Sequence, residues 1–234
     1  MNFDFTLSTL NFQLVFICGA NKKVDSRKIH FLITAGGTRE YIDPVRFISN
    51  ASSGKMGCEL ARAAIKAGHK ATLITTVKNL ELKIHNSQFK IAEVISAADM
   101  FKAVKKHFKK CDCLIMAAAV SDYTPIKISK TKIKKENENL TIQLKPTADI
   151  LKWAGKNKKL GQIVVGFALE DRNLRKNAEK KLKEKNLDMI VANSPAAIGA
   201  EKSTVYIKQK NKKWLTVPRV AKFSIAKKII AQIK

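Results

Sequence analysis

Groups suited to binding an anion are concentrated between residues 33 and 57, ITAGGTREYIDPVRFISNASSGKMG. A short apolar strand is expected to run into Gly36-Gly37-Thr38, and a helix is expected to begin near Gly54. Backbone N–H groups point outward at such a turn, and the dipole of the helix favours negative charge at its start. The loop also carries three side chains that could grip an anionic ligand, on Arg39, Arg46 and Asn50. The segment therefore predicts a phosphate site.

This segment differs from the two common phosphate-binding motifs. The dinucleotide fingerprint GxGxxG places its glycines within six residues, whereas here they are spread over residues 36–57. A Walker P-loop needs a leading glycine and a Ser or Thr after its lysine, and Ser53-Gly54-Lys55 has neither. An ordinary loop with solvated arginines is the alternative. The length of the loop and its density of Gly, Ser, Arg and Asn favour a binding function.

Two more polar clusters follow predicted strands. The run AAAVSDY at 117–123 combines small residues, which let a ligand approach the backbone, with Asp122, which could hold a ribose hydroxyl or a magnesium ion. The run GFALE at 166–170 offers Phe167 to cover a base. Each has a structural alternative, because Asp122 could cap a local turn and Phe167 could be a core residue.

Residues 126–145 (IKISKTKIKKENENLTIQLK) show strand periodicity on both sides of a polar turn and are expected to form a two-stranded flap. Such a flap could close over a polyphosphate through Lys132, Lys134 and Lys135. The alternative is a charged edge that prevents aggregation of the sheet. No Ser-His-Asp set, carboxylate pair or Cys-His pair stands out in the sequence. If the protein is an enzyme, nucleotidyl or phosphoryl transfer is favoured, because it works by positioning and charge neutralisation.

Strands and helices alternate along the rest of the chain, which predicts an α/β fold with a Rossmann-like, doubly wound, mostly parallel sheet. Expected strands are 29–34, 71–76, 90–94, 113–117, 162–166 and 188–192; expected helices are 57–68, 97–109, 174–186 and 219–233, with a second hairpin at 203–217. The continuous apolar run 113–117 predicts a central strand buried on both faces. Ligands of such folds bind at the carboxyl ends of the strands.

The composition suits one domain with a sizeable core, since 45% of the 234 residues are hydrophobic. No apolar run approaches the ~20 residues that span a bilayer, so no membrane association is expected. Residues 1–28 lack the basic start of a signal peptide and are interpreted as an extension that precedes a domain at 29–234. The four cysteines have no metal-binding spacing, which favours a reduced, cytoplasmic protein.

The formal net charge of +26 comes mainly from lysines spread along every segment. Nucleic-acid-binding proteins more often concentrate charge in one stripe with arginines and aromatics, so no specific nucleic-acid partner is expected. A polyanion-binding module without catalytic activity is one rival hypothesis. A dinucleotide-dependent oxidoreductase is another, but Thr75-Thr76 stands where an acidic residue should follow the second strand.

Taken in order, the motifs ITAGGTREYIDPVRFISNASSGKMG, AAAVSDY, KIKK, VGFALE and KNLDMIVANSP closely resemble those of the phosphopantothenoylcysteine synthetases (phosphopantothenate–cysteine ligases) of coenzyme A biosynthesis. The resemblance runs from about residue 29 to the C-terminus. It implies that CTP, with ATP as the alternative, activates the carboxylate of 4′-phosphopantothenate as an acyl-nucleotidylate, with Mg²⁺ in support. The amine of L-cysteine then attacks this intermediate and gives an amide.

The resemblance also implies roles for individual residues. Asn50 would orient the acyl intermediate, with Arg46 beside it. Ala119 would shape the second half-reaction, and Lys132 would stabilise charge during nucleotidyl transfer. Nucleotide binding would fall to Asp122 (ribose or Mg²⁺), Gly166, Phe167, Ala168, Lys181 and Lys185, in addition to the glycine turn of Gly36 and Gly37.

Family members are usually dimers whose substrate site borrows from the partner subunit, so a homodimer is expected. Many bacterial relatives are fused after a flavin-dependent decarboxylase domain, for which residues 1–28 leave no room. A stand-alone synthetase whose product passes to a separate decarboxylase is therefore expected. The sequence KMG at 55–57 matches the bacterial fusion type, which favours CTP over ATP.

Overall fold

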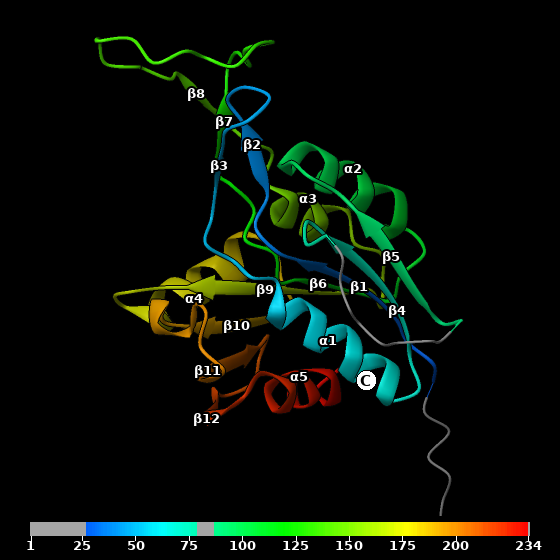
Figure 1. The fold of residues 1–234 in the computed structure, drawn as a ribbon. Helices are drawn as coiled ribbons and strands as arrows, with labels where there is room; N and C mark the ends of the chain where they lie inside the picture. Colours follow the sequence, from blue (N-terminus) through cyan, green and yellow to red (C-terminus); the bar gives the residue numbers. More distant parts are fainter. Residues whose placement is uncertain (1–26, 79–86, 234) are drawn as a thin grey trace, which may run out of the picture.

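The computed structural model describes residues 27–78 and 87–233. Within these residues, eight strands form one sheet in the order β12-β11-β10-β9-β6-β1-β4-β5 (Figure 1). Its parallel part consists of β1 (His30–Ala35), β4 (Lys70–Thr75), β5 (Phe89–Glu93), β6 (Cys113–Met116), β9 (Ile163–Leu169) and β10 (Met189–Asn193). Counted along the chain, these strands have the order 3-2-1-4-5-6 of a doubly wound Rossmann sheet. The predicted fold class is confirmed.

An antiparallel hairpin extends one edge of the sheet, as the sequence predicted. It consists of β11 (Lys202–Gln209) and β12 (Leu215–Ala221), with Asn211 in the turn at a φ of 64°. The C-terminal helix α5 (Lys222–Ala231) follows at once. It begins three residues later than expected because β12 continues to Ala221.

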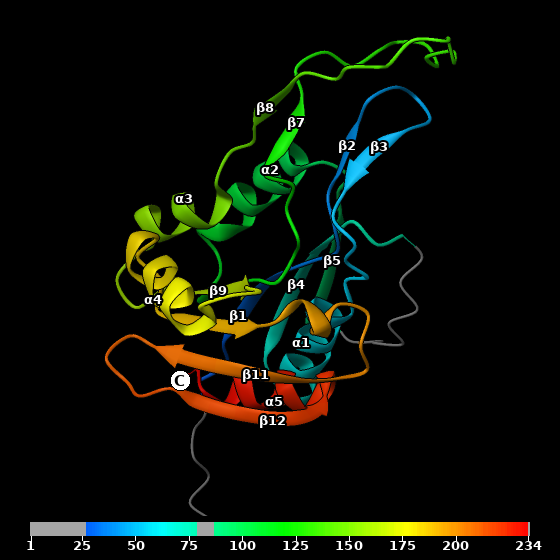
Figure 2. The ribbon, with the colours of Figure 1, turned by 90° about the vertical axis from the view of Figure 1, so that its left-hand side faces the viewer.

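Helices cover both faces of the sheet (Figure 2). One face packs against α1 (Lys55–Lys66) and α5, and the other against α2 (Ala97–Phe108), α3 (Ile150–Asn157) and α4 (Leu174–Glu184). Alternate residues of β6 enter the two cores, since Ile115 belongs to one and Leu114 to the other. The strand is buried on both faces, as its continuous apolar run predicted.

Two short hairpins form an outer unit beyond the carboxyl ends of the strands (Figure 1). They are β2 (Arg39–Tyr41) with β3 (Phe47–Ser49), and β7 (Tyr123–Pro125) with β8 (Leu144–Pro146). The predicted strands inside the flap at 126–145 are wrong, because the paired strands lie at its base and the stretch between them is not strand. Among the described residues, the flap contacts only the turn of the β2–β3 hairpin and has no second layer to bury a face against, so only its base stays paired.

The sequence interpretation missed several short elements. The loop after β1 contains the β2–β3 hairpin, and α3 and a 3₁₀ turn at Pro195–Ala197 were not expected. The extension predicted at 1–28 lies, except for its last two residues, outside the described residues. In the part of the chain that the structure describes, no helix has the length and apolarity needed to cross a membrane.

Candidate functional site

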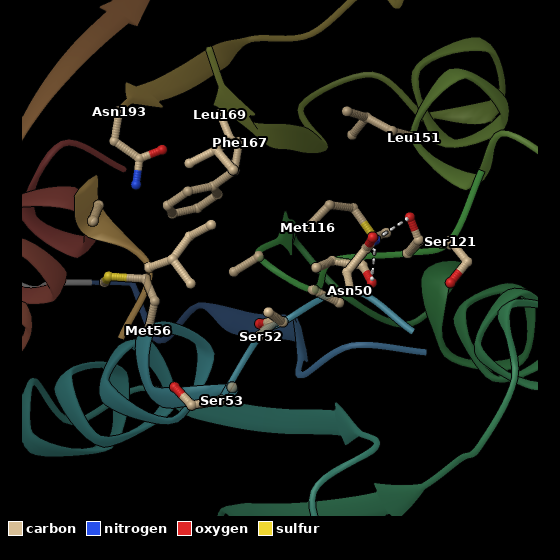
Figure 3. Close-up of a pocket in the computed structure, with 18 of the residues that line it drawn as sticks. Asn50, Ser52, Ser53, Met56, Met116, Ser121, Leu151, Phe167, Leu169 and Asn193 are labelled. Carbon is tan, nitrogen blue, oxygen red and sulfur yellow. Dashed lines mark hydrogen bonds between the residues drawn. The ribbon is translucent and has the colours of Figure 1, made fainter. Parts of the chain in front are cut away.

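A cavity of about 570 Å³ opens at the carboxyl ends of β6, β9 and β10 (Figure 3). Its walls come from segments far apart in the sequence: 50–56 before and in α1, 116–122 after β6, 147–151 at the start of α3, and parts of 167–222. The strand order reverses between β1 and β6, and doubly wound folds bind ligands at this point.

Asn50 lies in the middle of the cavity wall (Figure 3). Its Nδ2 atom donates to the backbone oxygens of Ala119 and Val120, at 3.3 Å each. The Ala119 oxygen also accepts from the backbone N–H of Thr38 at 3.2 Å. Asn50 and Ala119, which the resemblance placed at the reacting centre, are thus joined where the strand order reverses.

The glycines of the first motif let the loops approach one another. Gly36 has a φ of +88°, and a Cβ atom there would lie 2.2 Å from Oγ1 of Thr76. A Cβ atom on Gly37 would lie 2.5 Å from the backbone oxygen of Asn50. Both are buried and do not line the cavity. Their part in nucleotide binding remains a prediction, and within the described residues their role is to admit the close packing that positions Asn50.

The start of α1 faces the cavity. Gly54 caps the helix with a φ of 74° and makes no side-chain hydrogen bond itself, and the first turn contains no acidic residue. The N–H of Lys55 donates to Oγ of Ser53 at 3.4 Å. Gly54, Lys55 and Met56 line the cavity. The first N–H groups of a helix have no partner within it, so this helix start could offer them to an anion. The phosphate site itself remains a prediction.

Asp122 lies on the cavity wall with its side chain exposed. Its backbone oxygen accepts from the N–H of Thr147 at 2.8 Å, which ties the loop after β6 to the segment before α3. Within residues 27–78 and 87–233, no group of three or more His, Cys, Asp and Glu side chains could form a metal site. A magnesium ion at Asp122 would therefore depend on phosphate oxygens and water for its other ligands, which is usual for Mg²⁺.

Lys181 of α4 and Lys185, the residue that caps the end of that helix, line the cavity. The Nζ atom of Lys181 donates to the Phe167 backbone oxygen at 2.8 Å, and that of Lys185 forms an ion pair with Asp149 at 2.9 Å. Burial lowers the pKa of Lys181, and the neighbouring Lys185 lowers it further. For Asp149, burial alone would raise the pKa. Hydrogen bonds from Lys185 and from the N–H of Lys152 outweigh it, so the pKa is lowered.

Phe167 also lines the cavity, whereas its two neighbours do not. Gly166 lies beneath it, where a Cβ atom would come within 2.8 Å of Cδ1 of Leu187. Ala168 is fully buried in the core. Because side chains alternate along a strand, Phe167 faces the cavity and its neighbours support it from below.

Arg46 and Lys132 do not line the cavity; both lie on the outer unit. The buried carboxylate of Asp43 accepts from Nε of Arg46 at 2.9 Å, from the N–H of Ile133 at 3.1 Å and from two further backbone N–H groups. Arg46 in turn donates to the backbone oxygen of Ile133. Asp43 thus fixes the flap beside Lys132 to the β2–β3 hairpin. The structure does not bring either cation to Asn50.

Five further cavity residues were given no individual role from the sequence: Lys55, Asp149, Asn193, Ser203 and Lys222. Lys55 and Asn193 lie inside motifs quoted above. Asp149 caps α3 through the N–H of Lys152 at 2.9 Å, so its position before Ile150 was a readable helix-start signal. Ser203 and Lys222 carry no local signal, because they reach the site only through the packing of β11 and α5.

A chain with this sheet order and a cavity at this point is a ligand-binding protein of the doubly wound α/β class. The family model for the DNA/pantothenate metabolism flavoprotein C-terminal domain matches residues 26–234, and the chain belongs to that family. The resemblance to the phosphopantothenoylcysteine synthetases is thereby confirmed at the level of the family.

Individual relatives match most of this chain. The coenzyme A biosynthesis bifunctional protein CoaBC of Bacillus subtilis is 42% identical over 210 residues, which are 87% of this chain and 50% of that protein. A cysteine/cysteine sulfinic acid decarboxylase of an unknown prokaryotic organism is 46% identical over 179 residues, 76% of this chain and 49% of the relative. The chain thus spans about half the length of the curated relatives it matches.

A solved structure supports the fold directly. The crystal structure of the C-terminal domain of a coenzyme A biosynthesis bifunctional protein CoaBC has a TM-score of 0.74 and 36% sequence identity. The match covers 88% of this chain and 93% of that one.

Proposed function

We propose that this chain is a phosphopantothenate–cysteine ligase. In the first step, a carboxylate oxygen of 4′-phosphopantothenate attacks the α-phosphorus of a nucleoside triphosphate, and pyrophosphate leaves with the electron pair of the broken bond. In the second step, the amine of L-cysteine attacks the acyl carbon. The nucleoside monophosphate then leaves, and the amine loses a proton. The observation that carries the proposal is Asn50, held in the cavity by the carbonyls of Ala119 and Val120.

Asn50 suits the acyl centre for a reason of hydrogen bonding. Its Nδ2 group is directed at two carbonyls, so the Oδ1 atom is the part of the amide that a ligand meets. That atom accepts hydrogen bonds only, and the attacking amine supplies N–H donors. A residue fixed in this way positions the amine against the acyl carbon at little entropic cost.

The nucleotide is assigned to the side of the cavity formed by β9, α3 and α4. Phe167 provides an apolar face for the base, Asp122 an acceptor for the ribose, and Lys181 and Lys185 positive charge for the phosphates. Magnesium, held by Asp122 together with the phosphates, would neutralise charge on the triphosphate. CTP is the proposed nucleotide. A reducing cytoplasm as the location fits the free, buried thiols of Cys58, Cys111 and Cys113.

A second copy of the chain is proposed to complete the site. Exposed apolar side chains gather on the outer unit: Val45, Phe47, Ile48, Tyr123, Ile126, Ile128, Leu140 and Leu144. A concentration of exposed apolar side chains is typical of a subunit interface. Arg46 and Lys132 lie on the same unit, so a dimer formed through it would carry them to the interface.

The test is release of pyrophosphate by the purified protein with 4′-phosphopantothenate, Mg²⁺ and either CTP or ATP, with and without cysteine. Release should require phosphopantothenate and proceed faster with CTP. Asn50→Ala should lower kcat/KM for the cysteine-dependent step by about 100-fold or more, with little change in Tm because the side chain is exposed. Ser49→Ala, which alters the exposed neighbour, is the control. A folded wild-type protein that releases no pyrophosphate with either nucleotide would refute the proposal.

A further inference from the structure

The end of α4 has an asparagine where the backbone alone would favour glycine. Asn186 follows Lys185 and has a φ of 49°, in the left-handed region. Its N–H donates to the backbone oxygen of Lys183 at 3.1 Å, and the N–H of Leu187 donates to that of Leu182 at 2.9 Å. This pair of bonds is the Schellman motif, in which glycine most often occupies the left-handed position. The asparagine side chain therefore has a reason of its own to be there.

That side chain connects the end of α4 to α3. The Nδ2 atom of Asn186 donates to the backbone oxygen of Gly155 at 2.9 Å. Gly155 is buried in α3, and a Cβ atom on it would lie 1.8 Å from the backbone oxygen of Lys185. The backbones of α3 and of the end of α4 are thus in direct contact, and the Asn186 amide joins them across this contact. Neither glycine nor a carboxylate at position 186 could donate this bond.

The contact lies directly behind the cavity wall. Lys185 lines the cavity, and its Nζ atom pairs with Asp149, the residue that caps the start of α3, at 2.9 Å. Lys181 lines the cavity one helical turn earlier. The two helices are therefore joined twice, through Lys185 and Asp149 at the cavity and through Asn186 and Gly155 behind it. If the second connection were lost, the end of α4 could move and carry both lysines with it.

We propose that Asn186 is a positioning residue for nucleotide binding: by holding the end of α4 against α3, it sets where Lys181 and Lys185 stand in the cavity. Asn186 does not line the cavity, so it would act only through the two lysines. A lysine has a flexible stem, and the place of its ammonium therefore depends on how firmly its backbone is held. The inference rests on the proposed function, which assigns these lysines to the phosphates of the nucleotide.

The experiment uses Asn186→Gly, which keeps the left-handed backbone at no steric cost and removes only the side-chain donor. Dissociation constants for CTP and for 4′-phosphopantothenate are measured by calorimetry in the absence of cysteine. We expect the affinity for CTP to fall by about tenfold or more, because small displacements of binding groups are costly. The affinity for 4′-phosphopantothenate should change by less than about twofold. A merely structural role would lower Tm without separating the two ligands.

A second measurement follows Lys185 without any ligand. Although burial acts to raise it, the pKa of Asp149 is lowered by the side chain of Lys185 and by the N–H of Lys152. In Asn186→Gly, Lys185 should be held less firmly against Asp149, so the pKa of this carboxyl should rise toward its ordinary value of 3.8. Titration of the Asp149 carboxyl carbon by NMR gives this value for both proteins.

Asn211→Gly is the matched control. Asn211 is an exposed residue with a φ of 64° in the turn between β11 and β12, outside the cavity wall. The same change there alters the entropy of the unfolded chain in the same way, and it should leave both affinities and the Asp149 titration unchanged.

Three results would overturn the inference. One is wild-type CTP affinity and a wild-type Asp149 titration in Asn186→Gly that is folded by circular dichroism. Another is a shifted titration with unchanged CTP affinity, because Asn186 would then position a lysine that the nucleotide does not use. The third is an equal loss of affinity for 4′-phosphopantothenate, which would indicate a general disturbance of the cavity. Failure of the ligase assignment would appear separately, as absence of pyrophosphate release by the wild-type protein.

Discussion

At the scale of single residues, burial and charge decide how the cavity lysines act. Lys181 is partly buried against the Phe167 carbonyl, and burial lowers its pKa. The protonated ammonium is the form that can neutralise a triphosphate. Since the pKa is lowered, this form is lost at a lower pH than for an exposed lysine.

The pH dependence of catalysis should therefore report on Lys181. In the wild-type protein, kcat/KM for the nucleotide should fall as the pH rises through the lowered pKa of this lysine. Lys181→Arg, whose guanidinium stays protonated, should move that fall to higher pH. Rates of pyrophosphate release between about pH 7 and 10 give the profile, and Lys180→Arg, at an exposed neighbouring position, is the control. An identical fall in Lys181→Arg would exclude Lys181 as its source.

The sequence indicated some of the cavity residues and missed others. Six residues to which the motif resemblance gave roles line the cavity: Asn50, Ala119, Asp122, Phe167, Lys181 and Lys185. The roles themselves remain predictions. Gly166 and Ala168 are buried beneath it because they alternate with Phe167 along β9. Lys222 was invisible in the sequence because nothing local distinguishes it from the chain's many other lysines; its burial at the start of α5 follows from the packing of α5 beside α1.

At the scale of elements, Asp43 joins the flap to the β2–β3 hairpin. Burial alone would raise the pKa of its carboxyl, but the side chain of Arg46 and the N–H groups of Val45, Arg46 and Ile133 outweigh it and hold the pKa well below its usual value. A depressed pKa in the folded state stabilises the protein above the ordinary pKa of 3.8. This stabilisation is lost as the pH falls below that value.

Removing the charge of Asp43 should free the flap. In Asp43→Asn, the N–H of Ile133 loses its carboxylate acceptor, so its hydrogen exchange should become about tenfold faster or more. Exchange in β6, in the core, should stay unchanged. Exchange measured by mass spectrometry on peptides covering 127–135 tests this, with Asp171→Asn at an exposed position as the control. Unchanged exchange in the flap would show that Asp43 does not hold it.

At the scale of the whole molecule, the outer unit carries exposed apolar side chains together with Arg46 and Lys132, the two cations proposed to act in catalysis. Ile126 is 55% exposed at the base of the flap. If a dimer buries it, Ile126→Glu places an unpaired carboxylate in the interface, which costs several kcal/mol. We expect a dimeric wild-type protein and a monomeric variant by light scattering, with ligase activity reduced at least about tenfold.

Leu160→Glu is the matched control for this prediction, because Leu160 is fully exposed on a turn outside the outer unit. It should leave both the mass and the activity unchanged. A wild-type protein that is monomeric at assay concentration, yet fully active, would contradict a site completed by the partner.

The net charge of +26 predicts that the KM values for the anionic substrates rise as salt is added. A polyanion-binding module without catalytic activity would instead lose its binding function altogether at high salt.

The sequence by itself determined the class of fold and the positions of its parallel strands along the chain. Continuous apolar runs such as 113–117 specify buried strands, and helices between them enforce parallel pairing. It also determined the family, because motifs are local strings of residues. The tertiary structure decided which motif residues meet. It brings Asn50 to Ala119 across the reversal of strand order, but holds Arg46 and Lys132 on the outer unit, and it places Lys222 beside Lys55. Whether two residues far apart in the sequence meet depends on how the helices and strands pack, and this packing is a property of the whole chain.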